Sequence, residues 1–329
     1  MAIRILKRVP PAPGLKALIR RAQRRDRRSI AKLISITEND PRLRLAIISE
    51  IYWRTGRAYV IGVTGPPGCG KSTLIAQLAK RYRERGKSIG VVAVDPSSRL
   101  SGGAFLGDRV RMTELASDPK VFIRSMATRG HLGGVARATE DVVRILDACA
   151  MDHIIVETAG AGQSDVDIKK LANTTVVVTA PGLGDEIQAL KAGLMEIADI
   201  FVVNKGDRES AAMTMQELHS MIMMSESTGG WHRPVLRTTA TLGEGLTSLI
   251  SALEQHEQFV RDLESQGPRG EDMRLRADLL KAAREYFEGI TLQEIASTKT
   301  FERLLARVQA RRVDPYTAAH QLLKGLWVH

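Results

Sequence analysis

Cysteine is nearly absent from this sequence, with two among 329 residues, Cys69 and Cys149. Two cysteines so far apart provide neither the disulfide framework of a small secreted domain nor a cysteine-based metal cluster. No run of about 18 apolar residues occurs, so no membrane-spanning helix is expected. No apolar stretch precedes a cleavage site near residue 1, which argues against a secretory signal. These absences favour a globular protein of the reducing cytoplasm.

Positive charge is plentiful but unevenly placed. The net charge is +11, and residues 1–32 hold eleven lysines and arginines against one acid, Asp26. Such an arm suits an acidic partner, a nucleic acid or a solvated helix face. Aromatic residues make up only 4% of the chain and none lies in this arm, so nucleic-acid bases would find no side chains on which to stack. Nucleic acid is therefore not the expected partner.

Short apolar runs alternate with helical periodicity through the middle of the chain. The expected strands are 58–64, 89–95, 120–124, 153–157, 174–180, 199–203 and 234–239. The expected helices are 71–86, 134–149, 186–197, 211–225 and 245–264. This alternation predicts an α/β fold with a mostly parallel sheet that helices cover on both faces.

Helical extensions are expected on both sides of this unit. We expect a basic helical extension, a central α/β domain and a C-terminal helical segment, at 1–55, 56–265 and 266–329. The first part contains apolar spacing for helices near 15–34 and 41–53. Residues 267–270, Gly-Pro-Arg-Gly, read as a linker, and Asp314 caps a helix beyond it. A segment of this size buries little surface alone, so a dimer contact is expected there.

Residues 65–72 read Gly-Pro-Pro-Gly-Cys-Gly-Lys-Ser and match the phosphate-binding loop pattern GxxxxGK[ST]. A strand-like run precedes the loop and a helix start follows it, which is the context of a P-loop NTPase. The glycines let the backbone wrap a phosphate, and the helix N-terminus adds partial positive charge. Lys71 is expected to reach the β- and γ-phosphates. The predicted nucleotide-binding residues of this loop are Gly65, Pro66, Pro67, Gly68, Cys69, Gly70, Lys71, Ser72 and Thr73.

A second motif indicates which base is bound. Asn204-Lys205-Gly206-Asp207 follows an apolar run and matches the NKxD pattern of GTPases. The Asp207 carboxylate is able to accept both N–H groups on the guanine edge, whereas ATP would leave it unpaired at a cost in affinity. Lys205 is expected to cover the base and Asn204 to tie loops together. Thr239-Ala240 stand where many GTPases carry a Ser-Ala loop that touches guanine, so GTP and GDP are the expected ligands.

Oxygen-bearing side chains near the phosphate loop predict a Mg²⁺ site. The expected ligands are Ser72, Asp95, Asp108 and Glu157, although Asp95 also suits a turn start before proline. Glu157 begins Glu157-Thr158-Ala159-Gly160, where signalling GTPases show DxxG and the glycine N–H senses the γ-phosphate. Gln163 lies three residues beyond Gly160 instead of directly after it, which predicts slow intrinsic hydrolysis that a partner completes. The predicted catalytic residues are Lys71, Asp108, Glu157 and Gln163.

Longer motifs resemble one family over nearly the whole chain. They are GPPGCGKST, VDPSS, GGAFLGDRVRM, RGHLGGVA, ETAGAGQSD, PGLGDEIQALKAG and NKGD. Together they resemble the MeaB/ArgK group of GTPases, which are chaperones of adenosylcobalamin-dependent acyl-CoA mutases of the methylmalonyl-CoA mutase type. The chain departs from the group at Ala159, where valine is common, and at Thr239, where serine is usual.

The resemblance implies a function, partners and roles for residues. It implies Mg²⁺-dependent GTP hydrolysis that gates cofactor loading and protects or reactivates a mutase, and a homodimer joined through C-terminal helices. It places Asp95, Asp108 and Glu157 near the metal. A third, partner-sensing switch would lie at 181–193, with Asp185, Glu186, Gln188 and Lys191. The residues alone also allow a loop and helix start at this place, and they do not choose among related mutases.

Three other classes of protein are alternatives to this family. A nickel- or zinc-insertion GTPase would carry a His-rich tail or a Cys-x-Cys-Cys cluster, whereas this chain has seven scattered histidines and two distant cysteines. A kinase would need a base for an acceptor hydroxyl, and no such residue stands out. An RNA- or ribosome-associated GTPase that uses the basic arm remains an alternative.

Overall fold

The computed structural model describes most of the chain. The described residues are 13–95, 115, 117–127, 134–158, 164–182, 195–224, 230–265 and 292–327, with short pieces between 276 and 287. Within them, no helix is long and apolar enough to cross a membrane.

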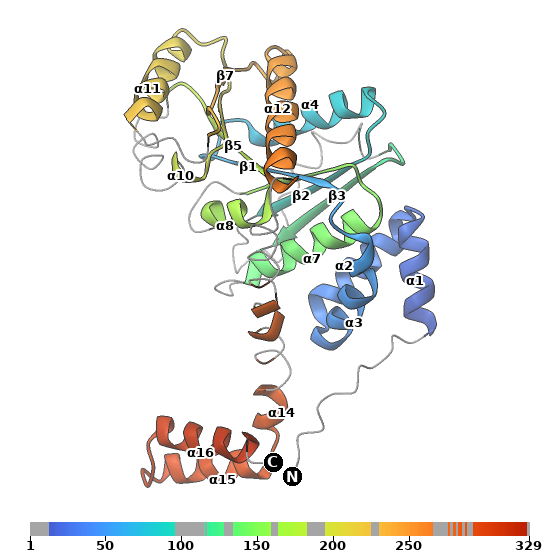
Figure 1. The fold of residues 1–329 in the computed structure, drawn as a ribbon, viewed down its shortest axis with the longest axis vertical. Helices are drawn as coiled ribbons and strands as arrows, with labels where there is room; N and C mark the ends of the chain where they lie inside the picture. The colour runs from blue at the N-terminus through green and yellow to red at the C-terminus, as the bar shows by residue number, and fades with distance from the viewer. Residues whose placement is uncertain are drawn as a thin grey trace.

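Seven parallel strands form a sheet in the order β3-β2-β4-β1-β5-β6-β7 (Figure 1). They are β1 Tyr59–Thr64, β2 Ile89–Asp95, β3 Val121–Ala127, β4 His153–Glu157, β5 Thr174–Thr179, β6 Ile200–Val203 and β7 Val235–Arg237. Strands β1, β4, β5 and β6 are buried along their whole length. Continuous burial explains why apolar residues stand side by side in these strands instead of alternating with polar ones. The predicted α/β class and all seven predicted strands are confirmed, with shifts at the ends.

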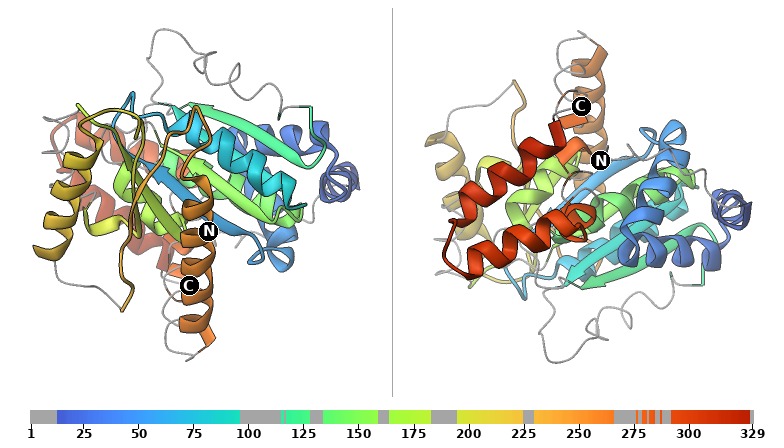
Figure 2. Two further views of the ribbon diagram at one scale, coloured as in Figure 1. Left: turned by 90° about the horizontal axis from the view of Figure 1, so that it is seen from above. Right: turned by 90° about the horizontal axis from the view of Figure 1, so that it is seen from below.

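Helices cover both faces of the sheet (Figures 1 and 2). They are α4 Lys71–Glu84, α7 Gly134–Ala148, α8 Ser164–Leu171, α10 Met195–Ile197, α11 Ala211–Met224 and α12 Leu246–Ser265. Helices α4 and α12 bury apolar side chains such as Leu78 and Leu249 against one face. Helix α7 covers the other face, where Ile145 and Leu146 join the core. Because all strands are parallel, their carboxyl ends meet at one edge of the sheet, between the two layers of helices.

The N-terminal part forms three helices instead of the expected two. They are α1 Pro13–Gln23, α2 Arg27–Asn39 and α3 Pro41–Ile51, followed by the short 3-10 helix η1 Tyr52–Arg54. The expectation of one helix near 15–34 is wrong because the chain turns at Arg25, which has a left-handed φ of 64°. Asp26 then caps α2, since its side chain accepts a hydrogen bond from the Ser29 N–H at 3.2 Å.

These helices share their core with α7. Leu15, Ile30 and Ile34 lie in the same buried cluster as the α7 side chains. A buried ion pair joins the two layers: Arg44 donates from Nη2 to Asp141 Oδ1 at 3.2 Å and from Nε to the other oxygen. Burial raises the pKa of Asp141, and the Arg44 guanidinium opposes that rise. The N-terminal helices are thus docked firmly on the sheet layer.

The C-terminal part adds α14 Leu292–Ala296, α15 Lys299–Gln309 and α16 Pro315–Trp327. Asp314 caps α16 as predicted, because its carboxylate accepts from the N–H groups of Tyr316 and Thr317, each at 2.9 Å. Figure 1 shows α15 and α16 side by side, away from the sheet. The expected linker at 267–270 lies outside the described residues, so the three-part division of the chain stays a prediction.

Replacement of Arg44 by methionine tests the docking of the N-terminal helices. Asp141 is 2% exposed. Arg44→Met would therefore leave a buried carboxylate whose remaining cationic neighbour, among the described residues, is Arg144 at 3.8 Å. We expect the free energy of unfolding to fall by about 3 kcal/mol, measured by urea titration with circular dichroism. Arg21→Met is the control, because Arg21 pairs with Asp26 at the surface and should cost less than about 1 kcal/mol. Equal losses in the two variants would contradict the docking role.

Candidate functional site

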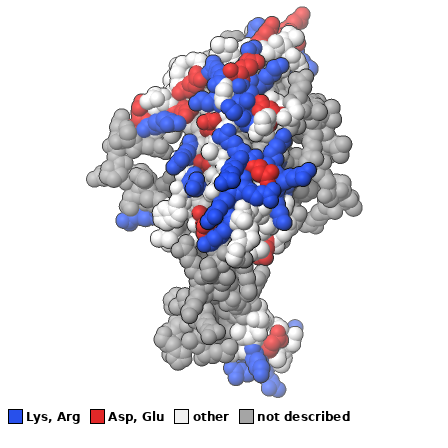
Figure 3. All heavy atoms as spheres, turned by 90° about the vertical axis from the view of Figure 1, so that its right-hand side faces the viewer, with Lys and Arg blue, Asp and Glu red and all other residues white. Residues whose placement is uncertain are grey.

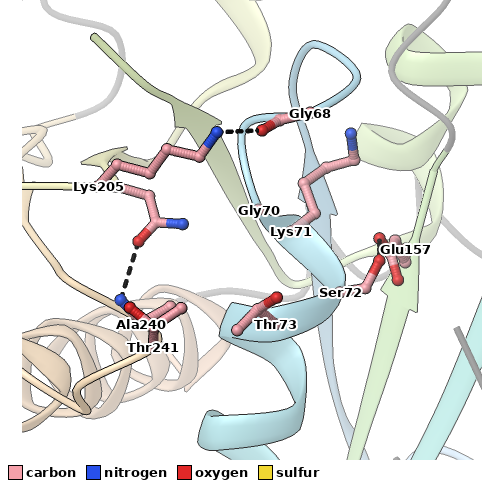
Figure 4. A pocket seen from close by; sticks show the side chains of 10 residues that line it. Gly68, Gly70, Lys71, Ser72, Thr73, Glu157, Lys205, Ala240 and Thr241 are labelled. Carbon is pink, nitrogen blue, oxygen red and sulfur yellow. Dashed lines mark hydrogen bonds between the residues drawn. The ribbon is translucent and has the colours of Figure 1, made fainter. Parts of the chain in front are cut away.

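A cavity of about 390 Å³ opens at the carboxyl ends of β1, β4 and β6 (Figure 4). It is lined by Gly68, Gly70, Lys71, Ser72, Thr73, Glu157, Asn204, Lys205, Ala240 and Thr241. Nine of these ten were predicted from sequence as site residues, and only Thr241 was not. Ligands of open α/β sheets bind in such crevices beyond the strand ends. The structure therefore brings the two predicted nucleotide motifs to one place.

Two glycines give the phosphate-binding loop its shape. Gly65 has a φ of 138°, and a Cβ there would lie 1.9 Å from the Val178 carbonyl oxygen. Gly70 has a φ of 95°, and a Cβ there would lie 2.4 Å from Asn204 Nδ2. Any other residue would be strained by its backbone and would clash with these neighbours. The phosphate-binding loop thus packs both against β5 and against Asn204. Residues 204–207 and 238–241 are called the guanine-side loops below, because the base contacts are predicted there.

Lys71 opens helix α4 directly after this loop. Its side chain is 6% exposed, and its ammonium donates to the carbonyl oxygens of Gly65 at 2.7 Å and Pro66 at 3.0 Å. An ammonium group has three donors, and these bonds hold it over the loop instead of in solvent. The N–H groups of the first α4 turn add partial positive charge nearby. This end of the cavity is suited to a phosphate chain.

Ser72 and Glu157 form the acidic side of the cavity. The Ser72 hydroxyl donates to Glu157 Oε1 at 2.7 Å, and Glu157 is 6% exposed. Parallel pairing sets Ala93 of β2 beside Glu157, so Asp95 follows two residues later on the neighbouring strand. A hydroxyl and a carboxylate are hard oxygen donors of the kind Mg²⁺ takes together with phosphate oxygens and water. The residues present therefore fit the predicted ion.

Several predicted site residues lie outside what the structure describes. They are Asp108, Gly160, Gln163, Asp185, Glu186, Gln188 and Lys191, together with the side chain of Asp95. Within the described residues, no group of three or more His, Cys, Asp or Glu is placed to hold a metal ion. The predicted metal-binding and partner-sensing roles therefore stay predictions. Of the predicted metal ligands, the structure brings Ser72 and Glu157 into contact.

Asn204 joins the guanine-side loops to the phosphate loop. Its Nδ2 donates to the Cys69 carbonyl oxygen at 2.9 Å, and its Oδ1 accepts from the Ala240 N–H at 3.0 Å and the Thr238 hydroxyl at 3.2 Å. Asn204 is 3% exposed, so these bonds are shielded from water. The predicted tying role matches this geometry.

The residues after Asn204 are held in a fixed turn. Lys205 has a left-handed φ of 54°, which is unusual for a side chain of this size, and its ammonium reaches the Gly68 carbonyl oxygen at 2.7 Å. The Gly206 N–H donates to the Thr238 carbonyl oxygen at 2.9 Å. Asp207 follows at once and is exposed, so its carboxylate is available for a ligand. Thr239, by contrast, is buried.

Cys69 lies inside the phosphate loop as an inert residue. It is fully buried in the core that α4 and α12 make with the sheet. Burial raises the pKa of its thiol, and the Lys71 ammonium opposes that rise. A thiol rather than a thiolate is therefore expected at neutral pH, which disfavours redox chemistry. The interpretation of Cys69 as a small packing residue agrees with this environment.

Sequence reasoning missed two arginines that contact the backbone at Pro181 and at Met195. Arg208 Nη1 donates to the Pro181 carbonyl oxygen at 3.3 Å, and Arg233 Nη1 donates to the Met195 carbonyl oxygen at 2.8 Å. Arg208 follows the carboxyl end of β6, whereas Arg233 precedes the amino end of β7. Their partners are carbonyl groups distant in sequence, so no local pattern could have found them. Thr241, in contrast, directly follows the predicted Thr239-Ala240 pair.

Comparison with known proteins identifies the family of this chain. Residues 30–288 match the profile of the family described as methylmalonyl Co-A mutase-associated GTPase MeaB. A protein of Pyrococcus horikoshii named as a GTPase is 47% identical over 313 residues, covering 94% of this chain and 97% of its own. A protein of Mycobacterium tuberculosis, also named as a GTPase, is 38% identical over 82% of this chain and 81% of its own.

One solved structure is similar over almost the full length. It is titled LAO/AO transport system kinase, with a TM-score of 0.67 and coverage of 95% of this chain and 97% of that chain. The sequence identity is 23%, so this likeness concerns the fold alone.

Replacement of Asp207 by asparagine tests the guanine assignment. The variant loses a charged acceptor for two guanine donors, so GTP affinity should fall about 100-fold. Xanthosine triphosphate should gain affinity, because the new amide is able to donate to the xanthine oxygen. Calorimetric titration with both nucleotides measures the change. Glu209→Gln, at an exposed position two residues away, should leave GTP affinity as it was, and an unchanged affinity in Asp207→Asn would overturn the assignment.

Proposed function

The chain belongs to the MeaB family of methylmalonyl Co-A mutase-associated GTPases, and we propose that it serves as a chaperone of an adenosylcobalamin-dependent acyl-CoA mutase. It binds GTP and hydrolyses it to GDP and phosphate. In the proposed role, hydrolysis gates cofactor loading and protects or reactivates the mutase. The observation that carries the proposal is the joined cavity, in which Asn204 links a phosphate loop to guanine-side loops, within a chain of this family.

The phosphate end of the cavity would stabilise negative charge. Lys71 and the first N–H groups of α4 face the place of the β- and γ-phosphates. Charge on the transferred phosphoryl group spreads over its oxygens in the transition state, and pre-positioned donors lower the barrier because they need no reorganisation. Its own loop holds the Lys71 ammonium at this end of the cavity, which supports the proposed role.

Ser72 would bind Mg²⁺ directly. Glu157 would lie near the ion, together with Asp95 and Asp108. When bound, the ion supplies positive charge for the phosphate oxygens. The hydrogen bond between Ser72 and Glu157 keeps the hydroxyl oriented toward β4. Glu157 is one methylene longer than the aspartate usual in signalling GTPases, so the same charge reaches further from the strand end.

Hydrolysis by the protein alone would be slow. The residue that orients the attacking water is either Gln163 or a group that the mutase donates. A partner that completes the site would accelerate turnover, and the segment 181–193 would sense that partner through Asp185, Glu186, Gln188 and Lys191. Residues 266–329 would join two copies into a homodimer, and residues 1–55 would form the basic extension.

Removal of the Lys71 ammonium tests the phosphate end. We expect Lys71→Ala to lower GTP turnover by about 100-fold or more, because a preorganised cation is lost from the transition state. The measurement is phosphate release at saturating GTP, together with nucleotide affinity. Lys80→Ala, an exposed lysine of the same helix, serves as the control. Turnover that survives in Lys71→Ala would remove the phosphate-loop assignment.

Partner-stimulated turnover tests the chaperone role. The purified protein is assayed for phosphate release alone and with a panel of adenosylcobalamin-dependent acyl-CoA mutases. We expect one mutase to raise turnover by at least 10-fold, because a completed water-positioning site contributes several kcal/mol. An unrelated acyl-CoA enzyme is the control. If no mutase changes the rate, the chaperone role is wrong while the GTPase activity stands.

A further inference from the structure

Exposed cations gather on the N-terminal helices. The group comprises Lys16, Arg20, Arg24, Arg28 and Lys32, all exposed, and is called the basic surface below. Figure 3 shows the face of the molecule that carries α1 and α2, with lysines and arginines concentrated across its middle. Successive members are four residues apart in sequence. Lys16 and Arg20 are neighbours on α1, and Arg28 and Lys32 are neighbours on α2, about 6 Å apart in each pair. Arg24 lies in the turn between the two helices.

The described part of the chain does not neutralise the basic surface. Among the described residues, its five cations form no ion pair. The two acids of α2 and its cap are already engaged, since Asp26 caps the helix and pairs with Arg21, and Glu38 pairs with Arg124. Solvated helix faces usually alternate the sign of charge. An uncompensated set of cations repels itself and contributes nothing to folding, so the fold does not explain it.

The fold requires only the other side of these helices. Leu15, Ile19, Ile30 and Ile34 are buried in the core shared with α7. This packing holds the charged side in a rigid position on the outside of the molecule. A charged surface mounted rigidly has less side-chain and backbone entropy to lose on binding than a flexible tail. The arrangement therefore favours a docking surface over a solubilising one.

The chemistry of the surface points to an acidic protein. Proteins that bind single-stranded nucleic acid stack bases on aromatic side chains among their cations, and residues 1–51 contain no aromatic residue. Arginine outnumbers lysine on this surface, and its planar guanidinium pairs in a bidentate manner with carboxylates. We propose that the basic surface docks an acidic face of the client mutase. This inference rests on the proposed function, because it names the surface through which that partner binds.

The position of the surface makes the proposal testable without damage to the nucleotide site. None of its five residues lines the nucleotide cavity. Replacing them should change the association with the mutase and leave basal turnover intact. Attraction between exposed charges is screened by salt, so the contribution should be largest at low ionic strength. Complementary charge acts mainly on the rate of encounter.

The experiment compares Arg20→Glu/Arg24→Glu with the wild type in mutase-stimulated GTP turnover. The mutase used is the one that stimulates the wild type most. We expect the concentration for half-maximal stimulation to rise about 10-fold at low salt, with unchanged basal turnover. Raising the salt should bring the two proteins together. The matched control compares two single variants in the same assay, Lys80→Glu and Arg24→Glu, because each replaces one exposed cation by one anion. The neutral Arg20→Gln/Arg24→Gln variant should show a smaller shift in the same direction.

Three outcomes would contradict the proposal that the basic surface docks the mutase. Equal half-maximal concentrations in the charge-reversed and wild-type proteins would overturn the surface proposal while the chaperone role stands. A lack of stimulation of the wild type by every mutase would overturn the chaperone role, and the surface proposal with it. Retention on double-stranded RNA that is lost in the variant, with mutase stimulation unchanged, would assign the surface to nucleic acid instead.

Discussion

Asn204 is the constraint on which the site depends. Its amide bonds to the Cys69 carbonyl oxygen and accepts from Thr238 and Ala240, so one buried side chain fixes the phosphate loop relative to both guanine-side loops. The same amide lies where any Cβ at position 70 would have to go. Gly70 is therefore needed for the loop to curve and also for the asparagine to reach it. This contact therefore connects the loop predicted to bind phosphate with the loops predicted to bind the base.

The chain presents two kinds of surface on one rigid scaffold. The carboxyl ends of the strands carry the nucleotide cavity, which both Lys71 and Glu157 line. The N-terminal helices carry cations outward while they share apolar core with α7. The buried pair of Arg44 and Asp141 and the pair of Arg124 and Glu38 connect these helices to α7 and β3. A partner that docks on α1 and α2 would thus bind a part of the molecule that is fixed to the sheet.

Much of the fold and site was predictable because its signals are local. Buried parallel strands such as 153–157 and 174–179 have three consecutive apolar residues at their centres, and the phosphate loop is a contiguous pattern. The helix near 15–34 was predicted wrongly because apolar spacing continues through the turn at Arg25, and only the Asp26 cap signals the break. The Arg208 and Arg233 contacts join residues far apart in sequence, so no periodicity reveals them.

The sequence by itself determined the order of elements, the nucleotide-binding class and the choice of guanine, because each depends on short motifs whose geometry is set by neighbouring residues. Only the tertiary structure decided that Ser72 meets Glu157, that Asn204 spans three loops, and that the basic arm packs its apolar side on α7. These contacts bring together residues that sheet pairing and helix packing place side by side. They follow from the order of strands and the layers of helices, which no local pattern encodes.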